Sequence, residues 1–151
     1  MNRVPLACLS ALLLLPTVPP SKGGPMDRSA DPRTAATLAA VERFNSAFNR
    51  HDVDAVMAAM TADCVFENTS PYPDGTRFTG QAEVREFWVR FFQNSPTAQF
   101  EAEDLFAAGD RCTVRWIYHK TKDGQPWHLR GVAVFRVRDG RIAEKLSYVK
   151  G

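Results

Sequence analysis

The sequence predicts one α+β domain, in which helices come first and hairpin-linked strands follow. Between residues 33 and 94, apolar residues recur every three or four positions in three segments, which is the spacing of amphipathic helices. After residue 99 the pattern changes to alternation, and the pairs that begin at Asp123 and Asp139 are Asp-Gly hairpin signals. This order predicts an antiparallel sheet that carries the helices on one face.

The three helices are delimited by capping and breaking residues. The first is expected over residues 33–49, and a short second one begins after Asp52, a suitable N-cap. The third begins after Gly80 and ends at the Asn-Ser-Pro sequence of residues 94–96. Their apolar faces consist of Leu38, Val41, Phe44 and Phe48, of Val53, Val56, Met57 and Met60, and of Val84, Phe87, Trp88, Phe91 and Phe92.

The strands are expected at residues 64–68, 99–106, 111–120, 127–137 and 142–149, and a loop rich in proline occupies residues 69–75. The last two strands carry apolar residues on both faces. An antiparallel sheet with one solvated face would alternate apolar with polar residues instead. We therefore expect one face to line a pocket and the other to form a homodimer interface through Val132, Val134, Leu146 and Tyr148.

Composition and charge exclude several classes of function. The net charge is +2, the isoelectric point is near 8.5, and no five like charges occur in a row, which argues against a nucleic-acid partner. The three cysteines, at positions 8, 64 and 112, lack the paired spacing of metal ligands. No metal and no cofactor are expected, and Cys64 and Cys112 are expected to be free thiols on strands that are not neighbours.

The N-terminal 25 residues are predicted to be a signal peptide or an extension. Arg3 precedes an apolar run over residues 4–18, which is of signal-peptide length and too short to span a bilayer comfortably. The prediction is an exported, periplasmic or extracellular protein, with a linker at 26–33, a domain at 34–151 and no stable membrane span in the mature chain. The alternative is a cytoplasmic protein that starts at Met26.

Five segments together resemble the nuclear transport factor 2-like superfamily, and within it the SnoaL-like branch. They are VERFNSAF at 41–48, NRHDVDA at 49–55, MTADCVFEN at 60–68, GQAEVREFW at 80–88 and VFRVRDGRI at 134–142. The resemblance covers residues 34 to 151. It implies a cone-shaped, curved antiparallel or mixed sheet, closed by three helices around an apolar pocket, and commonly a dimer through the outer face of the sheet.

Relatives in the SnoaL-like branch include polyketide cyclases, ketosteroid isomerases and limonene-epoxide hydrolases, so the resemblance implies no single activity. The isomerase base, tyrosine and acid fall on Asn68, Phe44 and Ala133, and all three roles are vacant. A SnoaL-type cyclase also needs an acidic residue in the pocket. Asp104 is the one acidic residue that could point inward.

The water-holding groups of the epoxide hydrolases are also incomplete. Asn68 matches their asparagine, but Phe66 replaces the tyrosine. Their arginine and two aspartates fall on Val114, Trp116 and Ser147, and a one-residue shift would restore Arg115 but place Ile117 at the first aspartate. Without a carboxylate nothing activates the water.

The same alignment points a mainly apolar set of side chains into the pocket: Phe66, Asn68, Trp116, Tyr118, Trp127, Phe135, Lys145 and Ser147. Asn68, Lys145 and Ser147 are the candidate catalytic residues. Lys145 could be a base or a Schiff-base amine if it is buried, or it could extend to the rim. The preferred hypothesis is a binder of a small hydrophobic molecule. The alternative is an isomerase, cyclase or hydrolase that acts on a polyketide, steroid or terpenoid.

Overall fold

The structure is a computed structural model that describes residues 31–150. The elements are α1 (Pro32–Asn49), α2 (Val53–Ala58), β1 (Met60–Glu67), β2 (Arg77–Thr79), α3 (Gly80–Asn94), β3 (Gln99–Ala108), β4 (Arg111–Lys122), β5 (Gln125–Arg138) and β6 (Arg141–Val149). The predicted α+β class is confirmed. Two local differences are that Met60 belongs to β1 instead of the second helix, and that β2 was not expected.

The six strands form one mixed sheet in the order β2-β1-β6-β5-β4-β3. Only the β1–β6 pair is parallel, and the other pairs are antiparallel. Both Asp-Gly hairpins form as predicted: Asp123 and Gly124, and likewise Asp139 and Gly140, adopt positive φ angles. That backbone matches the twist of the two strands that it joins.

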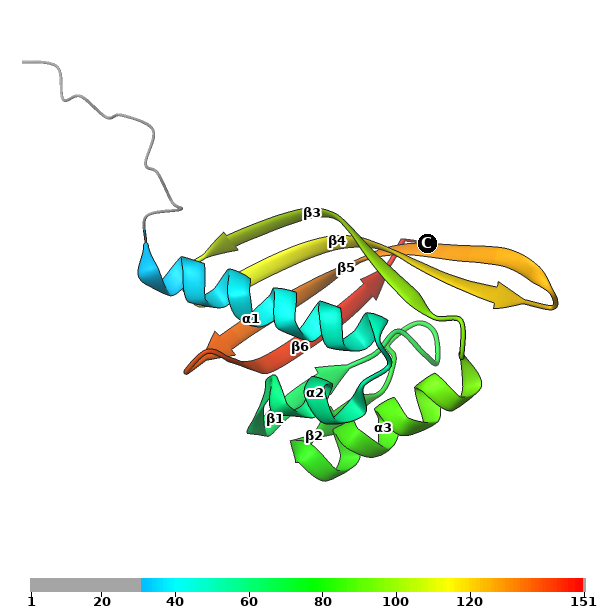
Figure 1. The fold of residues 1–151 in the computed structure, drawn as a ribbon, viewed down its shortest axis with the longest axis horizontal. Helices are drawn as coiled ribbons and strands as arrows, with labels where there is room; N and C mark the ends of the chain where they lie inside the picture. Colours follow the sequence, from blue (N-terminus) through cyan, green and yellow to red (C-terminus); the bar gives the residue numbers. More distant parts are fainter. Residues whose placement is uncertain (1–30, 151) are drawn as a thin grey trace, which may run out of the picture.

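The helices lie on one side of the curved sheet, with α1 running across it and α3 beside β1 and β2 (Figure 1). Asp31 caps α1 by accepting hydrogen bonds from the backbone N–H groups of Arg33 and Thr34. At its other end, the Asn49 side chain accepts from Phe100 N and donates to Phe100 O, at 2.8 and 2.9 Å. These contacts fix α1 over β3.

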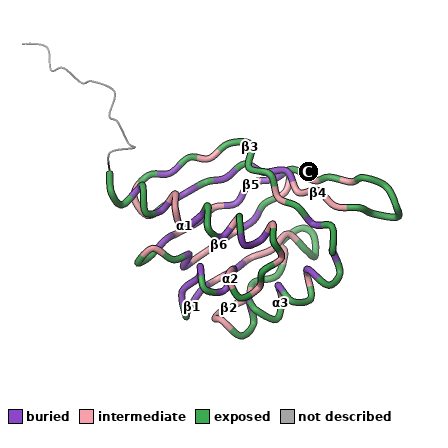
Figure 2. The backbone as a smooth tube through the Cα atoms, viewed as in Figure 1, coloured by how far each residue is buried: buried purple, intermediate pink, exposed green. Residues whose placement is uncertain are grey.

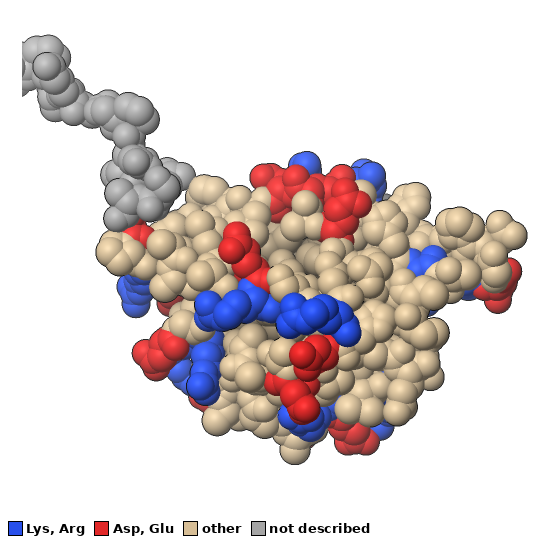
Figure 3. All heavy atoms as spheres, viewed as in Figure 1, with Lys and Arg blue, Asp and Glu red and all other residues tan. Residues whose placement is uncertain are grey.

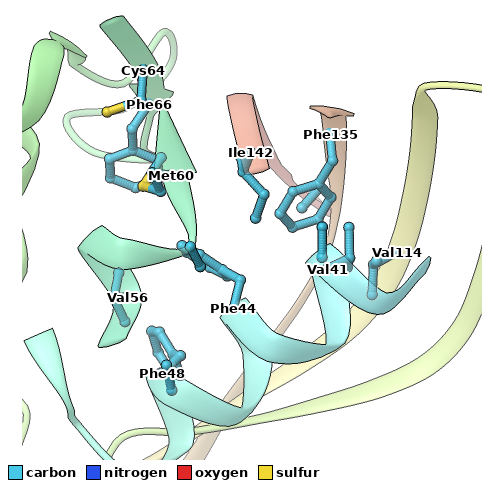
Figure 4. Close-up of a cluster of buried hydrophobic side chains, with 14 of the residues drawn as sticks. Val41, Phe44, Phe48, Val56, Met60, Cys64, Phe66, Val114, Phe135 and Ile142 are labelled. Atoms are coloured by element: carbon cyan, nitrogen blue, oxygen red, sulfur yellow. The ribbon is translucent and has the colours of Figure 1, made fainter. Parts of the chain in front are cut away.

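The core lies between the helices and the sheet, as the buried segments in Figure 2 show. Phe44 of α1 is at its centre and is 1% exposed (Figure 4). Its ring makes edge-to-face contacts with Trp88 of α3 and Phe135 of β5, at centroid distances of 5.9 and 6.0 Å. Cys64 and Cys112 are both buried and free, as predicted, and burial raises the pKa of the Cys112 thiol to about 11.

The opposite face of the sheet carries apolar side chains, as the alternation predicts. Val132, Val134 and Leu146 are half-buried there, and Tyr148 is 50% exposed. The register places Val134 opposite Leu146 and Val132 opposite Tyr148, so the four side chains form one patch, which we call the outer apolar patch.

On the face in Figure 3, positive and negative side chains are interspersed. Two of the exposed ion pairs are Arg85–Asp54 and Arg90–Glu86, each at 2.7 Å. Such surface pairs contribute little to stability. A mixed surface of this kind differs from the concentrated basic face of nucleic-acid-binding proteins.

The predicted signal peptide at 1–25 and most of the linker at 26–33 lie outside the described residues. Asp31 and Pro32 already belong to the first helix as its cap and first residue. Within residues 31–150, no helix is both long and apolar enough to cross a membrane. Export stays a prediction from the sequence.

Candidate ligand-binding site

A cavity of about 380 Å³ opens between the helices and the concave face of the sheet. This volume is in the range of small-molecule sites. Its walls come from α1, α3, the five strands β1, β3, β4, β5 and β6, and the turn after β1. The lining residues are Phe48, Phe66, Asn68, Thr69, Ser70, Phe87, Trp88, Phe91, Ser95, Phe100, Trp116, Tyr118, Lys120, Trp127, Leu129, Lys145 and Ser147.

The structure brings together seven of the eight predicted pocket residues. Phe135 is the exception, because it is fully buried beneath the cavity and packs on Phe44. Four aromatic residues that the sequence predicts for the core also line the cavity: Phe48, Phe87, Trp88 and Phe91. The sequence does contain a sign of this second role. Two pairs of adjacent aromatic residues on α3, at positions 87–88 and 91–92, make an apolar surface wider than packing on the core requires.

The aromatic walls include all three tryptophans of the chain. Trp116 can lie flat against β5 because its neighbour there is Gly131; a methyl group at Gly131 would overlap the indole ring and the carbonyl oxygen of Tyr148. The indole N–H groups of Trp88 and Trp116 are buried and have no acceptor within the described residues. Buried donors without acceptors are uncommon in native proteins.

Lys145 is the most unusual residue in this cavity. The sheet register places it between Phe66 on β1 and Phe135 on β5. Its side chain does not extend to the rim: the residue is 7% exposed, and Nζ lies 5.0 Å from the Phe66 ring centre and 5.7 Å from that of Phe135. Of the two positions that the sequence allows for the amine, the rim and the interior, the structure has the interior.

Among the described residues, the Lys145 amine has one polar partner, the side chain of Ser147, to which Nζ donates a hydrogen bond of 2.6 Å. Within the described residues, no Asp or Glu lines the cavity, so no carboxylate compensates the charge of an ammonium group there. Desolvation therefore lowers the pKa of Lys145 from 10.5 to about 7.

Asn68 borders the cavity, but its oxygen is already used. Oδ1 accepts hydrogen bonds from Ser70 N at 3.2 Å and from Thr76 N at 2.7 Å, which closes the loop after β1. Within the described residues, none of the hydrogen bonds joins Asn68 to Lys145 or Ser147. Asn68, which was expected to bind a ligand, therefore mainly holds the loop closed, and only its amide nitrogen is available to a ligand.

Tyr118 and Asp104 are two further residues that the sequence suggested for the pocket. Burial raises the pKa of the Tyr118 phenol, and a hydrogen bond with the Ser95 side chain partly opposes that shift. Asp104, the acidic residue that could have pointed inward, is exposed on β3 opposite Arg115 and does not line the cavity. The register shift in β3 between Ala102 and Asp104 directs it to the outer face.

A family model described as a SnoaL-like domain matches residues 41–145. The chain belongs to the SnoaL-like family. A nuclear transport factor 2-like protein of unknown function from Mesorhizobium loti is 40% identical to this SnoaL-like protein. Their structures superpose with a TM-score of 0.69, over 80% of this chain and 96% of that one.

Two other solved structures are similar to the SnoaL-like protein. An epoxide hydrolase from Mycobacterium tuberculosis, of the limonene-epoxide-hydrolase-like type, is 26% identical, with a TM-score of 0.65 over 79% of this chain and 86% of that one. A protein with a ketosteroid isomerase-like fold from Catenulispora acidiphila, in complex with trimethylamine, is 18% identical, with a TM-score of 0.62 over 72% and 83%. At this identity, the similarity to the Catenulispora acidiphila protein establishes a shared fold only. A comparison with curated proteins finds no match.

The SnoaL-like protein carries apolar residues at two positions where the ketosteroid isomerases place acid–base groups, as the sequence indicated. Phe44 and Ala133, at the isomerase tyrosine and acid positions, are buried and apolar. Within the described residues, the polar side chains that line the cavity carry two amines, hydroxyls, an amide and indole N–H groups. These groups can donate hydrogen bonds, and none of them is a carboxylate.

Proposed function

We propose that this SnoaL-like protein binds a small, largely apolar molecule in the cavity that contains Lys145. The observation that carries the proposal is the cavity itself, which has a volume of about 380 Å³, walls of aromatic side chains and a buried amine. Removing aromatic and aliphatic ligand surface from water would supply most of the affinity.

The polar groups of the cavity favour a ligand that carries hydrogen-bond acceptors. Lys145 is a donor in both of its protonation states, and the hydroxyls of Tyr118 and Ser147 can also donate. A cationic ligand would be repelled by the protonated fraction of Lys145. Neutral molecules with a hydroxyl or carbonyl oxygen fit this set best.

Because all three tryptophans line the cavity, intrinsic fluorescence reports directly on its occupation. We expect saturable quenching by at least one member of a panel of neutral alcohols: benzyl alcohol, cinnamyl alcohol, 2-naphthalenemethanol and 1-octanol. Leu129→Arg should abolish it, because Leu129 lines the cavity. His128→Arg is the matched control, because His128 directly precedes Leu129 on β5, is exposed and points to the other face.

Quenching that grows linearly with every alcohol, or that is equally strong in Leu129→Arg, would contradict the proposal. Thermal unfolding of both variants separates a blocked cavity from a misfolded chain.

A second candidate function is catalysis on a small hydrophobic substrate, such as a polyketide, steroid or terpenoid. The observation that favours it is the amine of Lys145, which burial makes more nucleophilic at neutral pH than an exposed lysine. An enzyme of this kind would work without the carboxylates of the isomerases and hydrolases.

We also propose that the outer apolar patch is the interface of a homodimer. A second copy fits because the patch lies across two central strands, β5 and β6, and contiguous exposed apolar surface usually marks an interaction site. In a two-fold dimer each patch would cover its own counterpart.

Val134→Lys should convert the dimer into a monomer, because it places a charge at the centre of the outer apolar patch. Sedimentation velocity at micromolar concentration measures the change. Val89→Lys is the matched control on the helical side, where Val89 is 37% exposed, and should leave the dimer intact. A wild-type protein that already sediments as a monomer at this concentration contradicts the interface.

A further inference from the structure

We propose that Lys145 is a nucleophilic amine that forms an imine with the aldehyde or ketone group of a ligand in the cavity. This inference rests on the proposed function, because it names the substrate class of the same site. It also assigns a reaction to Lys145 in a cavity whose described lining contains no carboxylate.

The position of the amine supports this role. Lys145 extends from β6 into the cavity between two phenylalanines, and its residue is 7% exposed. A lysine with a structural role in a protein interior is normally paired with a carboxylate. Here, within residues 31–150, the cavity lining contains no acidic residue, and Nζ donates a hydrogen bond to the hydroxyl of Ser147 at 2.6 Å.

The charge state of the amine supports it further. The other titratable groups that line the cavity within the described residues are Tyr118 and Lys120, both on β4. A cation over the faces of Phe66 and Phe135 gains some attraction. Desolvation outweighs it and lowers the pKa of Lys145 to about 7. Roughly half of the amines are then unprotonated at pH 7, against about 0.03% for an ordinary lysine.

The reaction balances without an oxidant or a reductant. The Nζ lone pair attacks the carbonyl carbon, a C–N bond forms, and the C=O π electrons move to oxygen. A proton passes from nitrogen to that oxygen, with the Ser147 hydroxyl within reach as the relay. The nitrogen lone pair then forms the C=N bond while the hydroxyl group takes up the remaining N–H proton and leaves as water. The products are one imine and one water molecule.

The apolar surroundings favour the product. Phe66, Phe135 and Trp116 exclude bulk water from the floor of the cavity, which slows hydrolysis of an imine. Ser147 lies opposite Ala133 on β5, and its side chain lines the cavity. Ser147 is a positioning residue in this scheme, because it orients Nζ and relays a proton.

The test uses 2-naphthaldehyde with sodium cyanoborohydride, which reduces an imine to a stable secondary amine. At pH 7 we expect one naphthylmethyl group per chain, located at Lys145 by peptide mapping. Lys145→Met should lack this adduct. Lys120→Met, which removes the other lysine of the cavity lining, should retain it. The rate at Lys145 should exceed that at exposed lysines on the order of 100-fold at pH 7, because a far larger fraction is unprotonated.

The pH dependence provides a second readout. Adduct formation at Lys145 should rise through pH 7 and level off by about pH 8.5, whereas exposed lysines continue to gain reactivity towards pH 10. Ser147→Ala should slow the reaction without moving the adduct to another residue.

The outcomes separate the two proposals. If 2-naphthalenemethanol or another alcohol of the panel quenches fluorescence saturably but the aldehyde modifies Lys145 no faster than exposed lysines, the imine is overturned and the binding site stands. If neither the alcohols nor the aldehyde occupy the cavity, the proposed function fails as well.

Discussion

Replacing Lys145 by methionine should raise the free energy of unfolding at pH 6 by about 2–5 kcal/mol, because the wild-type protein must desolvate or deprotonate a buried amine in order to fold. Methionine has a similar length and needs no hydrogen-bond partner. The loss of the Lys145–Ser147 hydrogen bond subtracts about 1 kcal/mol from this gain.

The sign of the pH dependence follows from the two pKa values of Lys145. The amine titrates near 10.5 in the unfolded chain and near 7 in the folded protein. Between these values the unfolded state binds more protons, so the wild-type stability rises with pH. The penalty is complete below about pH 7 and disappears above about pH 10.5, and the advantage of Lys145→Met should shrink across the same window.

Urea unfolding of both proteins at several values between pH 6 and pH 9.5 measures this effect. Lys120→Met is the matched control, because Lys120 borders the same cavity but is only half-buried. A stability difference for Lys145→Met that stays constant over the window would show that the buried amine is not deprotonated by folding.

Asn68→Leu should lower the free energy of unfolding by roughly 1–3 kcal/mol, because it removes the oxygen that accepts hydrogen bonds from Ser70 N and Thr76 N. Gly75 packs directly on the backbone of Asn68, at a positive φ angle that favours glycine, so the loop has little freedom to find another arrangement. The same urea experiments at pH 7 measure the loss.

Asn68→Asp is the matched control, since it keeps an oxygen at the Oδ1 position and should retain most of the stability. If the wild type and Asn68→Leu unfold at the same urea concentration, the loop does not depend on these two hydrogen bonds. Asn68→Leu should weaken alcohol binding in the fluorescence assay mainly by displacing the loop. In the wild type, only the amide nitrogen of Asn68 is available to a ligand.

The sequence was sufficient for the fold class and for the direction of most strand side chains. Helical spacing from Val41 to Phe48 and alternation from Val132 to Phe135 are local consequences of burial, so they can be read without coordinates. The Asp-Gly turns indicated which strands are neighbours, and the family resemblance implied that Trp116, Lys145 and Ser147 point into the pocket, where the structure has them.

Other features depend on residues that are distant in the sequence. The role of the Asn68 oxygen is set by the Thr76 amide, eight residues further along, and β2 exists because residues 77–79 can pair with β1. The contribution of Phe87 and Phe91 to the cavity follows from the angle at which α3 meets the sheet. Local pattern carries no information about that angle.

Lys145 shows most clearly what each level decides. By itself the sequence determined that Lys145 and Leu146 point to opposite faces of the sheet, because side chains on a strand alternate, and the family resemblance implied that Lys145 is on the inner face. Only the tertiary structure decided whether the flexible side chain reaches solvent or stays inside. Phe66 from β1 and Phe135 from β5 enclose it, and the pKa of Lys145 falls because these rings replace the water that would have solvated the charge.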